Sequence, residues 1–298
     1  MNGGDAFKPP ANEVRISFAQ LREHLRFPTF VVVWLAPFAV YMLLCFTYTF
    51  TFIRIPSVCV LLSVFFGLAS AALFLMRSRG PLFLPLAFGG SVAVATGTLF
   101  GLYVYDKFAV FPRFYANSRL YANVVPSQPS AAVADAGAIV FTAESFVDGE
   151  KSVGYVTESG YHYCAAPIRD NSRAVQVEFW AVGMGCCHER GKFWCDDSED
   201  PQARAGITVF DNNGFFDAAS NKDQYIKARL KAEATFGLFS VKDPMYVRWV
   251  REDNLNMLSR QYSHKTLAIL LLLSFVHLVG FLGMAFVLWK PHSVLLWH

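Results

Sequence analysis

Long apolar stretches alternate with polar segments along this chain. Three of them come early, at residues 29–53, 56–76 and 81–105, and a fourth lies at 266–289. Each is longer than the roughly 18 to 20 apolar residues that cross a membrane, and none contains Asp, Glu, Lys or Arg. The pattern predicts four transmembrane helices. The short connection at 54–55 leaves open whether the first two form a full hairpin or a re-entrant pair.

The polar region between the third and fourth apolar stretches has the pattern of a folded domain. In segment 174–182, Val177 and Phe179 alternate with polar residues, which is typical of a strand with one buried face. A helical pattern follows at 223–236, with Leu230 among the apolar residues on one side. Further strands are predicted at residues 138–142, 152–157, 161–168, 206–210 and 245–250. We expect an α+β fold with a mainly antiparallel sheet.

Composition divides the rest of the chain. The Pro-, Ser- and Ala-rich segment 124–137 is typical of a linker and follows a dense set of aromatic residues. In the N-terminal tail, Val14, Phe18, Leu21 and Leu25 recur at helical spacing, which predicts an amphipathic helix or a solvated extension of the first span. The expected parts are a cytosolic tail (1–27), transmembrane helices 1 to 3 (28–105), an aromatic juxtamembrane segment with linker (106–137), a β-rich exoplasmic or luminal domain (138–262), and transmembrane helix 4 with a short cytosolic tail (263–298).

Charge gives the predicted spans an orientation. Only 16% of the residues are charged, below the roughly 25% of soluble domains. Basic residues gather on one side of the spans, at Lys8, Arg15, Arg22, Arg26, Arg77, Arg79 and Lys290. The positive-inside rule therefore predicts cytosolic termini and an exoplasmic domain, in the plasma membrane or an endomembrane. Acidic and basic residues nearly balance in that domain, which argues against nucleic acid as a partner.

The large polar region contains four of the six cysteines: Cys164, Cys186, Cys187 and Cys195. An even number in an oxidising compartment predicts two disulfides. A bond between the adjacent Cys186 and Cys187 needs a strained ring, so we expect Cys164 to pair with one of them and Cys195 with the other. The alternative is a zinc site that includes nearby histidines, although the spacing matches no standard finger or ribbon. No cofactor or bound metal is expected.

Small residues recur every four positions on two of the predicted spans. On the third span they are Gly89, Ala93, Gly97 and Gly101, and on the second they are Ser63, Gly67 and Ala71. Such stripes let helix backbones approach closely in lipid. We predict that spans two and three pack face to face along them.

His277 lies near the middle of the fourth apolar stretch. An intramembrane histidine can serve as a proton relay or a ligand group. The other three stretches contain no Asp, Glu, Lys, Arg or His that could continue a proton path. We therefore expect a neutral His277 that donates one interhelical hydrogen bond, which argues against a transporter.

Signatures of catalysis are largely missing. The sequence has no GxSxG elbow, HExxH helix, Walker loop or Rossmann glycine pattern. The acidic run at 196–200 lacks the loop of an EF-hand and is expected to be a solvated turn. Trp180, Phe193 and Trp194 lie beside the cysteines and are candidates for contacting a partner, with core packing as the alternative for Trp180.

The layout resembles that of tetraspanins. It has four spans, cytosolic termini, and a large loop between spans three and four that carries the adjacent Cys186 and Cys187. Members of that family organise partner proteins laterally in membranes and use the large loop for recognition. This chain departs from their pattern in having His188 after Cys187, where the family has glycine, and in its β-rich large loop.

Together these features predict a non-enzymatic, multi-pass membrane protein. We expect its disulfide-stabilised exoplasmic domain to bind a ligand or a membrane or extracellular protein, with the lipid bilayer around its spans. The first alternative is an accessory or pore-forming subunit of a membrane complex. The second is a luminal enzyme.

Overall fold

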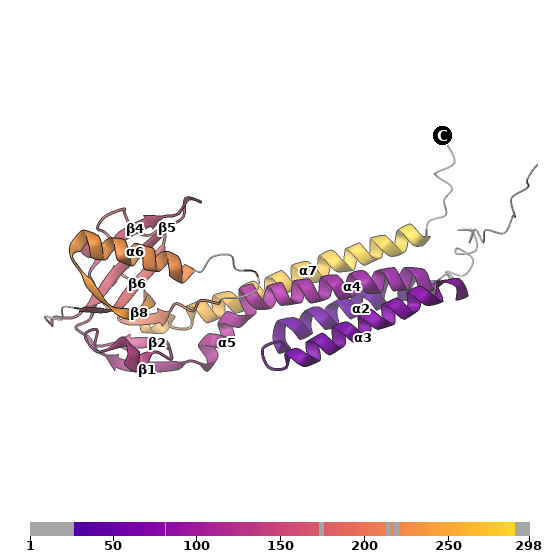
Figure 1. Cartoon of the computed structure of the whole chain (residues 1–298), viewed down its shortest axis with the longest axis horizontal. Helices are drawn as coiled ribbons and strands as arrows, with labels where there is room; N and C mark the ends of the chain where they lie inside the picture. Colours follow the sequence, from indigo (N-terminus) through magenta and orange to yellow (C-terminus); the bar gives the residue numbers. More distant parts are fainter. Residues whose placement is uncertain (1–26, 81, 173–175, 213–215, 217–220, 290–298) are drawn as a thin grey trace, which may run out of the picture. The chain divides into compact units, whose positions relative to one another are not determined.

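The chain forms two compact units, one of residues 1–102 with 270–298 and one of residues 103–269. Figure 1 shows their elements. The computed structural model describes residues 27–80, 82–172, 176–212, 216 and 221–289. The amphipathic helix expected in the N-terminal tail, the C-terminal tail and the first residues of the strand predicted at 174–182 lie outside these ranges.

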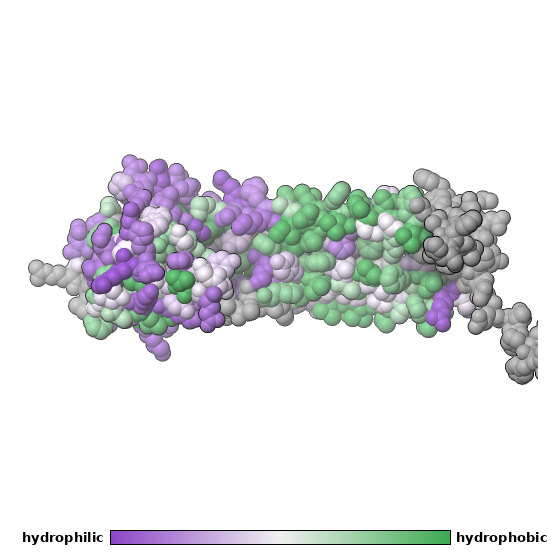
Figure 2. All heavy atoms as spheres, turned by 90° about the horizontal axis from the view of Figure 1, so that it is seen from above, coloured by the Kyte–Doolittle hydropathy of each residue, from purple (hydrophilic) through white to green (hydrophobic). Residues whose placement is uncertain are grey.

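The first unit consists of helices α2, α3 and α4 and the C-terminal part of α7 (Figure 1). These helices are Phe27–Thr51, Pro56–Leu75, Phe83–Val104 and Met257–Trp289. Within the described residues, four helices are long and apolar enough to cross a membrane, which indicates a multi-pass membrane protein. Figure 2 shows hydrophobic side chains over the surface of these helices.

Helices α2 and α3 form a full hairpin rather than a re-entrant pair. They contain 25 and 20 residues, and a helix of 20 residues is about 30 Å long. In the connection, the Ile55 N–H donates to the Thr51 carbonyl at 3.1 Å. Pro56 begins α3 at a position where a backbone N–H would have no partner in the helix.

The small-residue stripe of α4 packs against α2, and the prediction that it packs against α3 is wrong. A Cβ atom on Gly97 would lie 3.0 Å from the Tyr41 carbonyl oxygen, and one on Gly101 would lie 2.8 Å from that of Cys45. On α3, a Cβ atom on Gly67 would have no neighbour within 4 Å. A stripe reveals that a helix has a close-packing face but not which helix covers it, because every span offers similar apolar surface.

Hydroxyl groups form hydrogen bonds between helices α2, α3 and α4. The Ser63 hydroxyl donates to the Tyr48 hydroxyl of α2 at 3.1 Å and lies 3.0 Å from the Thr98 hydroxyl of α4. Thr49 of α2 donates to the Gly101 carbonyl of α4 at 3.3 Å. Each such bond between spans contributes on the order of 1 kcal/mol or less.

The second unit is built on a sheet for which the described residues supply eight strands. Its order is β1-β2-β7-β8-β6-β5-β3, and β4 pairs with β5. The pairs β1–β2 and β6–β8 are parallel, whereas the other neighbouring strands are antiparallel. The strands are Arg119–Val124, Ala136–Phe141, Phe146–Val147, Val153–Val156, His162–Arg169, Gln176–Met184, Ala205–Thr208 and Phe239–Val250. The predicted domain between the third and fourth spans is therefore present, and its sheet is mixed.

The segment predicted to be a linker belongs to this domain, so the expected domain start at residue 138 is wrong. Strand β1 pairs with β2, and the connection between them contains the 3-10 turn Ser130–Val133. Ser130 donates through its backbone N–H and its hydroxyl to the Glu178 carboxylate of β6, at 2.9 and 3.0 Å. Amino-acid composition could not distinguish a flexible linker from this connection, which is held by a hydrogen bond to a residue 48 positions further along the chain.

Both faces of the central strand β6 are buried. Phe179 packs on one face, where its ring lies 5.3 Å from that of Phe141. Trp180 packs on the other face, beneath helix α6 (Asn221–Phe236) (Figure 1). Two layers of apolar side chains therefore enclose this strand, although its sequence alternates like that of a half-exposed strand.

Helix α6 meets the sheet through alanines. Ala228 and Ala232 are fully buried and Tyr225 is 6% exposed, whereas Leu230 is 49% exposed. The predicted packing side is therefore correct for Tyr225 and wrong for Leu230. Small side chains let the helix approach the sheet closely, where larger aromatic residues of the sheet fill the space. On the other part of the same domain, α5 (Val110–Asn117) and the first turns of α7 contribute to a separate small core.

A short π-helix, Tyr105–Ala109, follows α4 and carries a buried carboxylate. Asp106 is 1% exposed and accepts hydrogen bonds from the Asn212 amide at 2.9 Å and the Phe216 N–H at 3.0 Å. These bonds anchor the chain that follows β7. The apolar pattern ends one residue before Asp106, so this role of the carboxylate could not be predicted from the local pattern.

Candidate functional site

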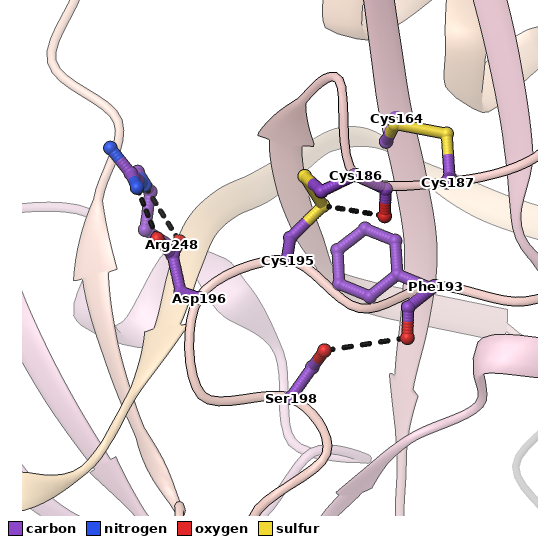
Figure 3. Close-up of a disulfide and its surroundings, with 8 residues drawn as sticks. All are labelled: Cys164, Cys186, Cys187, Phe193, Cys195, Asp196, Ser198 and Arg248. Carbon is purple, nitrogen blue, oxygen red and sulfur yellow. Dashed lines mark hydrogen bonds and ion pairs between the residues drawn. A yellow bond between two sulfur atoms is a disulfide. The ribbon is translucent and has the colours of Figure 1, made fainter.

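The cysteine-rich segment contains the two disulfides that the sequence predicts. Cys164 of β5 is bonded to Cys187, and Cys186 is bonded to Cys195 (Figure 3). The adjacent cysteines therefore take different partners. An antiparallel bridge between Cys187 and Phe193 closes the segment into a hairpin. The hairpin is thus held both to strand β5 and to itself.

The sulfur atoms of this cluster are bonded to one another rather than free to hold a metal. The sulfurs of Cys164, Cys186 and Cys195 lie within 4.8 Å of one another, but each belongs to a disulfide. Zinc binds thiolates, so the alternative of a zinc site would require both bonds to be reduced. Cys45 and Cys59 are free and buried in the first unit.

The aromatic residues predicted to contact a partner are mostly core residues. Trp180 is fully buried and its indole N–H donates to the Ser240 hydroxyl at 2.9 Å. Phe193 is 6% exposed and packs in the core beside the disulfides. Trp194 is partly buried and its ring lies 5.0 Å from that of His188. The prediction of a contact surface is therefore wrong for Trp180 and Phe193, whose hydrophobicity serves folding.

Three of the four acidic residues after Cys195 are bonded within the domain, namely Asp196, Asp197 and Asp200, whereas Glu199 is exposed, so the expected solvated turn is present only in part. Asp196 pairs with Arg248 (Figure 3). Asp197 accepts hydrogen bonds from the Arg251 N–H at 2.9 Å and the Asn254 amide at 3.0 Å. Burial disfavours the charged form of Arg248, but its hydrogen bonds to Asp196 and the negative charge of that carboxylate together outweigh burial and raise the pKa of the guanidinium. The run therefore holds the end of β8.

His277 makes no interhelical hydrogen bond among the described residues. Its Nδ1 lies 2.8 Å from the Leu273 carbonyl of its own helix, and its ring stacks on that of Tyr41 at 3.8 Å. The ring of Phe100 meets it edge-on at 5.5 Å. The expected interhelical bond is therefore wrong. The Nδ1 atom of His277 is hydrogen-bonded within α7, one turn before the histidine. The imidazole ring packs against aromatic rings of other helices.

A cleft of about 490 Å³ lies in the second unit between helix α6 and the edge of strands β7 and β8. Lys222, Ile226 and Arg229 line one wall at helical spacing, so they share one face of α6. The 3-10 turn Ser130–Val133 and the start of β2 contribute to the opposite wall. The size is typical of a small-molecule site.

A bulge in strand β8 contributes to the lining of this cleft. Along β6 the pairing moves from Val177 to Phe179, whereas along β8 it moves from Ser240 to Met245. The extra residues include Lys242, Asp243 and Pro244, which line the cleft. Bulges of this kind often redirect side chains beside a functional site. A proline inside a strand-like run was the available sequence signal, and the sequence interpretation did not use it.

Two buried donors lie among the residues that line the cleft. Tyr246 is 4% exposed, and its hydroxyl makes no hydrogen bond within the described part of the chain. The buried Nε–H of Arg229 also has no acceptor there, although its Nη1 donates to Glu233 at 2.9 Å. A buried donor without an acceptor costs about 1 to 3 kcal/mol. The pair therefore calls for an explanation.

The Tyr246 hydroxyl keeps its proton at neutral pH. Burial raises the pKa of this hydroxyl to about 12, although the neighbouring Arg229 guanidinium lowers it. The Tyr246 O–H therefore remains a donor, and its oxygen lies close enough to the Arg229 guanidinium to accept from it. An acceptor brought by a ligand would satisfy the O–H. Among the described residues, this cleft is the place where a cavity, unpaired charge and unsatisfied donors occur together.

Comparison with known protein families, with characterised proteins and with solved structures finds no match to this chain. Neither the glycine stripes nor the cysteine pair in the sequence pointed to the cleft, because its walls come from five segments that are distant in sequence.

Proposed function

We propose that this protein is a multi-pass membrane protein whose sheet domain faces an oxidising compartment and binds a small molecule in the cleft beside α6. The cleft carries this proposal, because it combines a suitable volume with two buried donors that lack acceptors. Its walls are held in place in advance by the bonds of Ser130 to Glu178 and of Arg229 to Glu233. Preorganised walls reduce the cost of binding.

The proposed side of the membrane follows from the cysteines and the basic residues. Disulfides persist in oxidising compartments, and both disulfides lie in the sheet domain. We infer cytosolic termini from the basic residues near them, by the positive-inside rule. Domain and termini are then on opposite sides of the membrane.

Protease digestion of sealed vesicles tests the side. In vesicles that keep the cytosolic face outward, we expect the sheet domain to be protected and to become sensitive when detergent opens the vesicle. The N-terminal tail should be cleaved without detergent, which provides the internal control. Cleavage of the domain in intact vesicles would contradict the proposed topology.

Native mass spectrometry of the protein extracted in mild detergent tests the binding. We expect a small molecule to remain bound to the purified protein and to be lost in Ala131→Trp, which places an indole at the wall of the cleft. Ala143 lines a different pocket, so Ala143→Trp is the matched control and should retain the molecule. Equal retention in both variants would contradict binding in this cleft.

A role as an accessory subunit is the second candidate, and it is favoured by exposed small residues on the spans. Cβ atoms on Gly67 of α3 and on Gly280 and Gly283 of α7 would meet no atom within 4 Å. Such positions allow another helix to approach closely. A protein partner that co-purifies in a constant ratio, and that is lost in Gly280→Leu, would support this role.

A further inference from the structure

The charged groups that line the cleft differ in how far they are already neutralised. Asp135 accepts a hydrogen bond from the Tyr121 hydroxyl at 2.7 Å and pairs with Arg119 at 3.4 Å. Lys222 and Lys242 line the cleft too, and neither has an ion pair or a hydrogen bond with any residue that the structure describes. Positive charge is thus available on the α6 wall and on the β8 bulge.

Two further carboxylates line the cleft, those of Asp211 and Asp243, and Asp211 already interacts with another residue. Asp243 lies beside Lys242 in the bulge, and its carboxylate has no hydrogen-bonded partner among the described residues. Against it stand the two free lysines, whereas Arg229 is already paired with Glu233 through Nη1 at 2.9 Å. The balance of free charge at the cleft is therefore positive.

The two buried donors also favour an anionic ligand. A hydroxyl and a guanidinium N–H both require an acceptor, and Arg229 offers the planar fork that recognises carboxylate and phosphate groups. Tyr246 and Arg229 are neighbours, since the charge of Arg229 acts on the Tyr246 hydroxyl. A single oxyanion placed against the guanidinium would be within reach of both after a small rotation of their side chains.

The rest of the lining suits the body of an organic molecule. Ile226 of α6, Pro244 and Met245 of β8, and Phe114 of α5 supply apolar surface. Inorganic phosphate would leave this surface uncovered and would fill only a small part of the cleft. A ligand with an anionic group and an apolar portion fits both parts of the lining.

From these observations we propose that the cleft binds a small organic phosphate or carboxylate, with its anionic group held by Arg229, Tyr246 and Lys242. The proposal rests on the proposed binding function and names its ligand class. It accounts for the unpaired donors, the unpaired lysines and the apolar walls by one occupant.

The first experiment measures binding of defined probes to the full chain in nanodiscs of phosphatidylcholine. Isothermal titration with phenyl phosphate, benzoate, inorganic phosphate and phenol separates charge from apolar contact. We expect phenyl phosphate to bind about tenfold or more tightly than inorganic phosphate, since only the former covers apolar surface. Phenol should not bind detectably. The proposal would be overturned if phenol bound as tightly as phenyl phosphate. It would also be overturned if neither phenyl phosphate nor benzoate bound.

Variants locate the anion. Arg229→Gln and Lys242→Gln should each weaken phenyl phosphate binding by about tenfold or more, because each removes a charge beside the proposed oxyanion. Lys227 is on the same helix, with its ammonium over the Tyr155 ring at 5.4 Å and outside the cleft, so Lys227→Gln is the control and should not change the affinity. An equal loss in Lys227→Gln would show a general effect of charge and would contradict the site.

Tyr246→Phe tests the site even if the other variants fail to fold. This change removes only the unpaired hydroxyl, so the melting temperature without ligand should stay equal or rise. The increase in melting temperature caused by phenyl phosphate should become smaller. A lower melting temperature together with an unchanged ligand effect would show that the hydroxyl serves folding and not the ligand, and would overturn its assigned role.

Two further measurements are needed. One asks whether the bound phosphate belongs to a lipid or to a water-soluble molecule, and the other distinguishes failure of the anion proposal from failure of the proposed binding function. Soluble dihexanoyl phosphatidic acid that binds more tightly than phenyl phosphate would support the proposal and identify a lipid headgroup as the source. The reverse order would support it with a water-soluble phosphate as the source. A neutral molecule that co-purifies and is retained in Arg229→Gln would overturn the anion proposal while the proposed binding function stands.

Discussion

Arg248 of strand β8 holds the carboxylate of Asp196 through two nitrogen atoms, Nε and Nη2 (Figure 3). Asp196 directly follows Cys195, so this ion pair joins the disulfide-bonded hairpin to the strand that leads toward α7. The Asp196 side chain is 11% exposed, which places the pair away from full solvent screening. Two-point geometry and partial burial both favour a measurable contribution.

Replacing Asp196 by Asn should therefore destabilise the sheet domain. We expect a loss of about 1 to 3 kcal/mol, because the guanidinium of Arg248 is left partly buried without its counter-charge. Denaturant unfolding followed by tryptophan fluorescence measures it. The control is Glu252→Gln, which removes an ion pair to Arg204 whose side chains are 44% and 47% exposed. That change should cost less than about 0.5 kcal/mol, and an equal loss in both variants would contradict the reasoning.

The two disulfides should differ in the stability that they contribute. Cys164 and Cys187 are 23 residues apart, whereas Cys186 and Cys195 are 9 apart. Restriction of the unfolded chain predicts a loss of about 3.5 kcal/mol for Cys164→Ala with Cys187→Ala, and about 2.5 kcal/mol for Cys186→Ala with Cys195→Ala. Equilibrium unfolding of the two double variants tests the order.

Peptide mapping without reduction tests the pairing itself. Cys45 and Cys59 should be the thiols that become alkylated when the protein is unfolded, and the linked peptides should join Cys164 to Cys187. A peptide that links Cys164 to Cys186 or Cys195 would contradict the arrangement. Four alkylated thiols in the sheet domain would contradict both disulfides.

The glycines of the spans provide a matched pair of substitutions. Gly97→Ala places a methyl group 3.0 Å from the Tyr41 carbonyl oxygen, so α2 and α4 must move apart. We expect a loss of about 1 to 3 kcal/mol, measured by thermal unfolding in detergent. Gly67→Ala meets no atom within 4 Å and should be neutral or stabilising by up to about 1 kcal/mol, since alanine is the better helix former. An equal change of stability in Gly97→Ala and Gly67→Ala would show that α2 and α4 are not in close contact at Gly97.

The spans and most strands could be predicted from the sequence because their signals are local. A run of apolar residues or an alternating pattern is complete within one segment, as in β6 and α3. The partner of the α4 stripe could not be predicted in this way. Gly97 needs a close neighbour, but the neighbour is chosen by the packing of all the spans.

The cleft was hidden for a related reason. Its walls meet only when the β1–β2 connection, β7, β8 and α6 are assembled, so no single segment contains its pattern. Ser130 illustrates this, because its bond partner Glu178 lies on a distant strand and its own neighbourhood has the composition of a linker. The proline in the β8 bulge was a local sign of irregularity, but it does not reveal what the irregularity serves.

Alkaline pH should unfold the sheet domain through its buried tyrosines. Burial raises the pKa of Tyr246 from 10.0 to about 12, and it raises the pKa of Tyr115 and Tyr225 as well. The unfolded chain loses these protons near pH 10, whereas the folded chain retains them. Stability is therefore fully present below about pH 10 and falls as pH rises toward 12.

Tyr246→Phe should flatten that decline. Removing its hydroxyl eliminates one proton that the folded state retains, so the loss of stability between about pH 10 and 12 should shrink by on the order of 2 kcal/mol. Unfolding measured at several pH values tests this, with tyrosinate absorbance to report the titration. Tyr161 is 60% exposed, so Tyr161→Phe should leave the slope unchanged. The same slope in Tyr246→Phe and in the unaltered protein would show that this hydroxyl is hydrated rather than buried, and the case for an unsatisfied donor beside the cleft would fail with it.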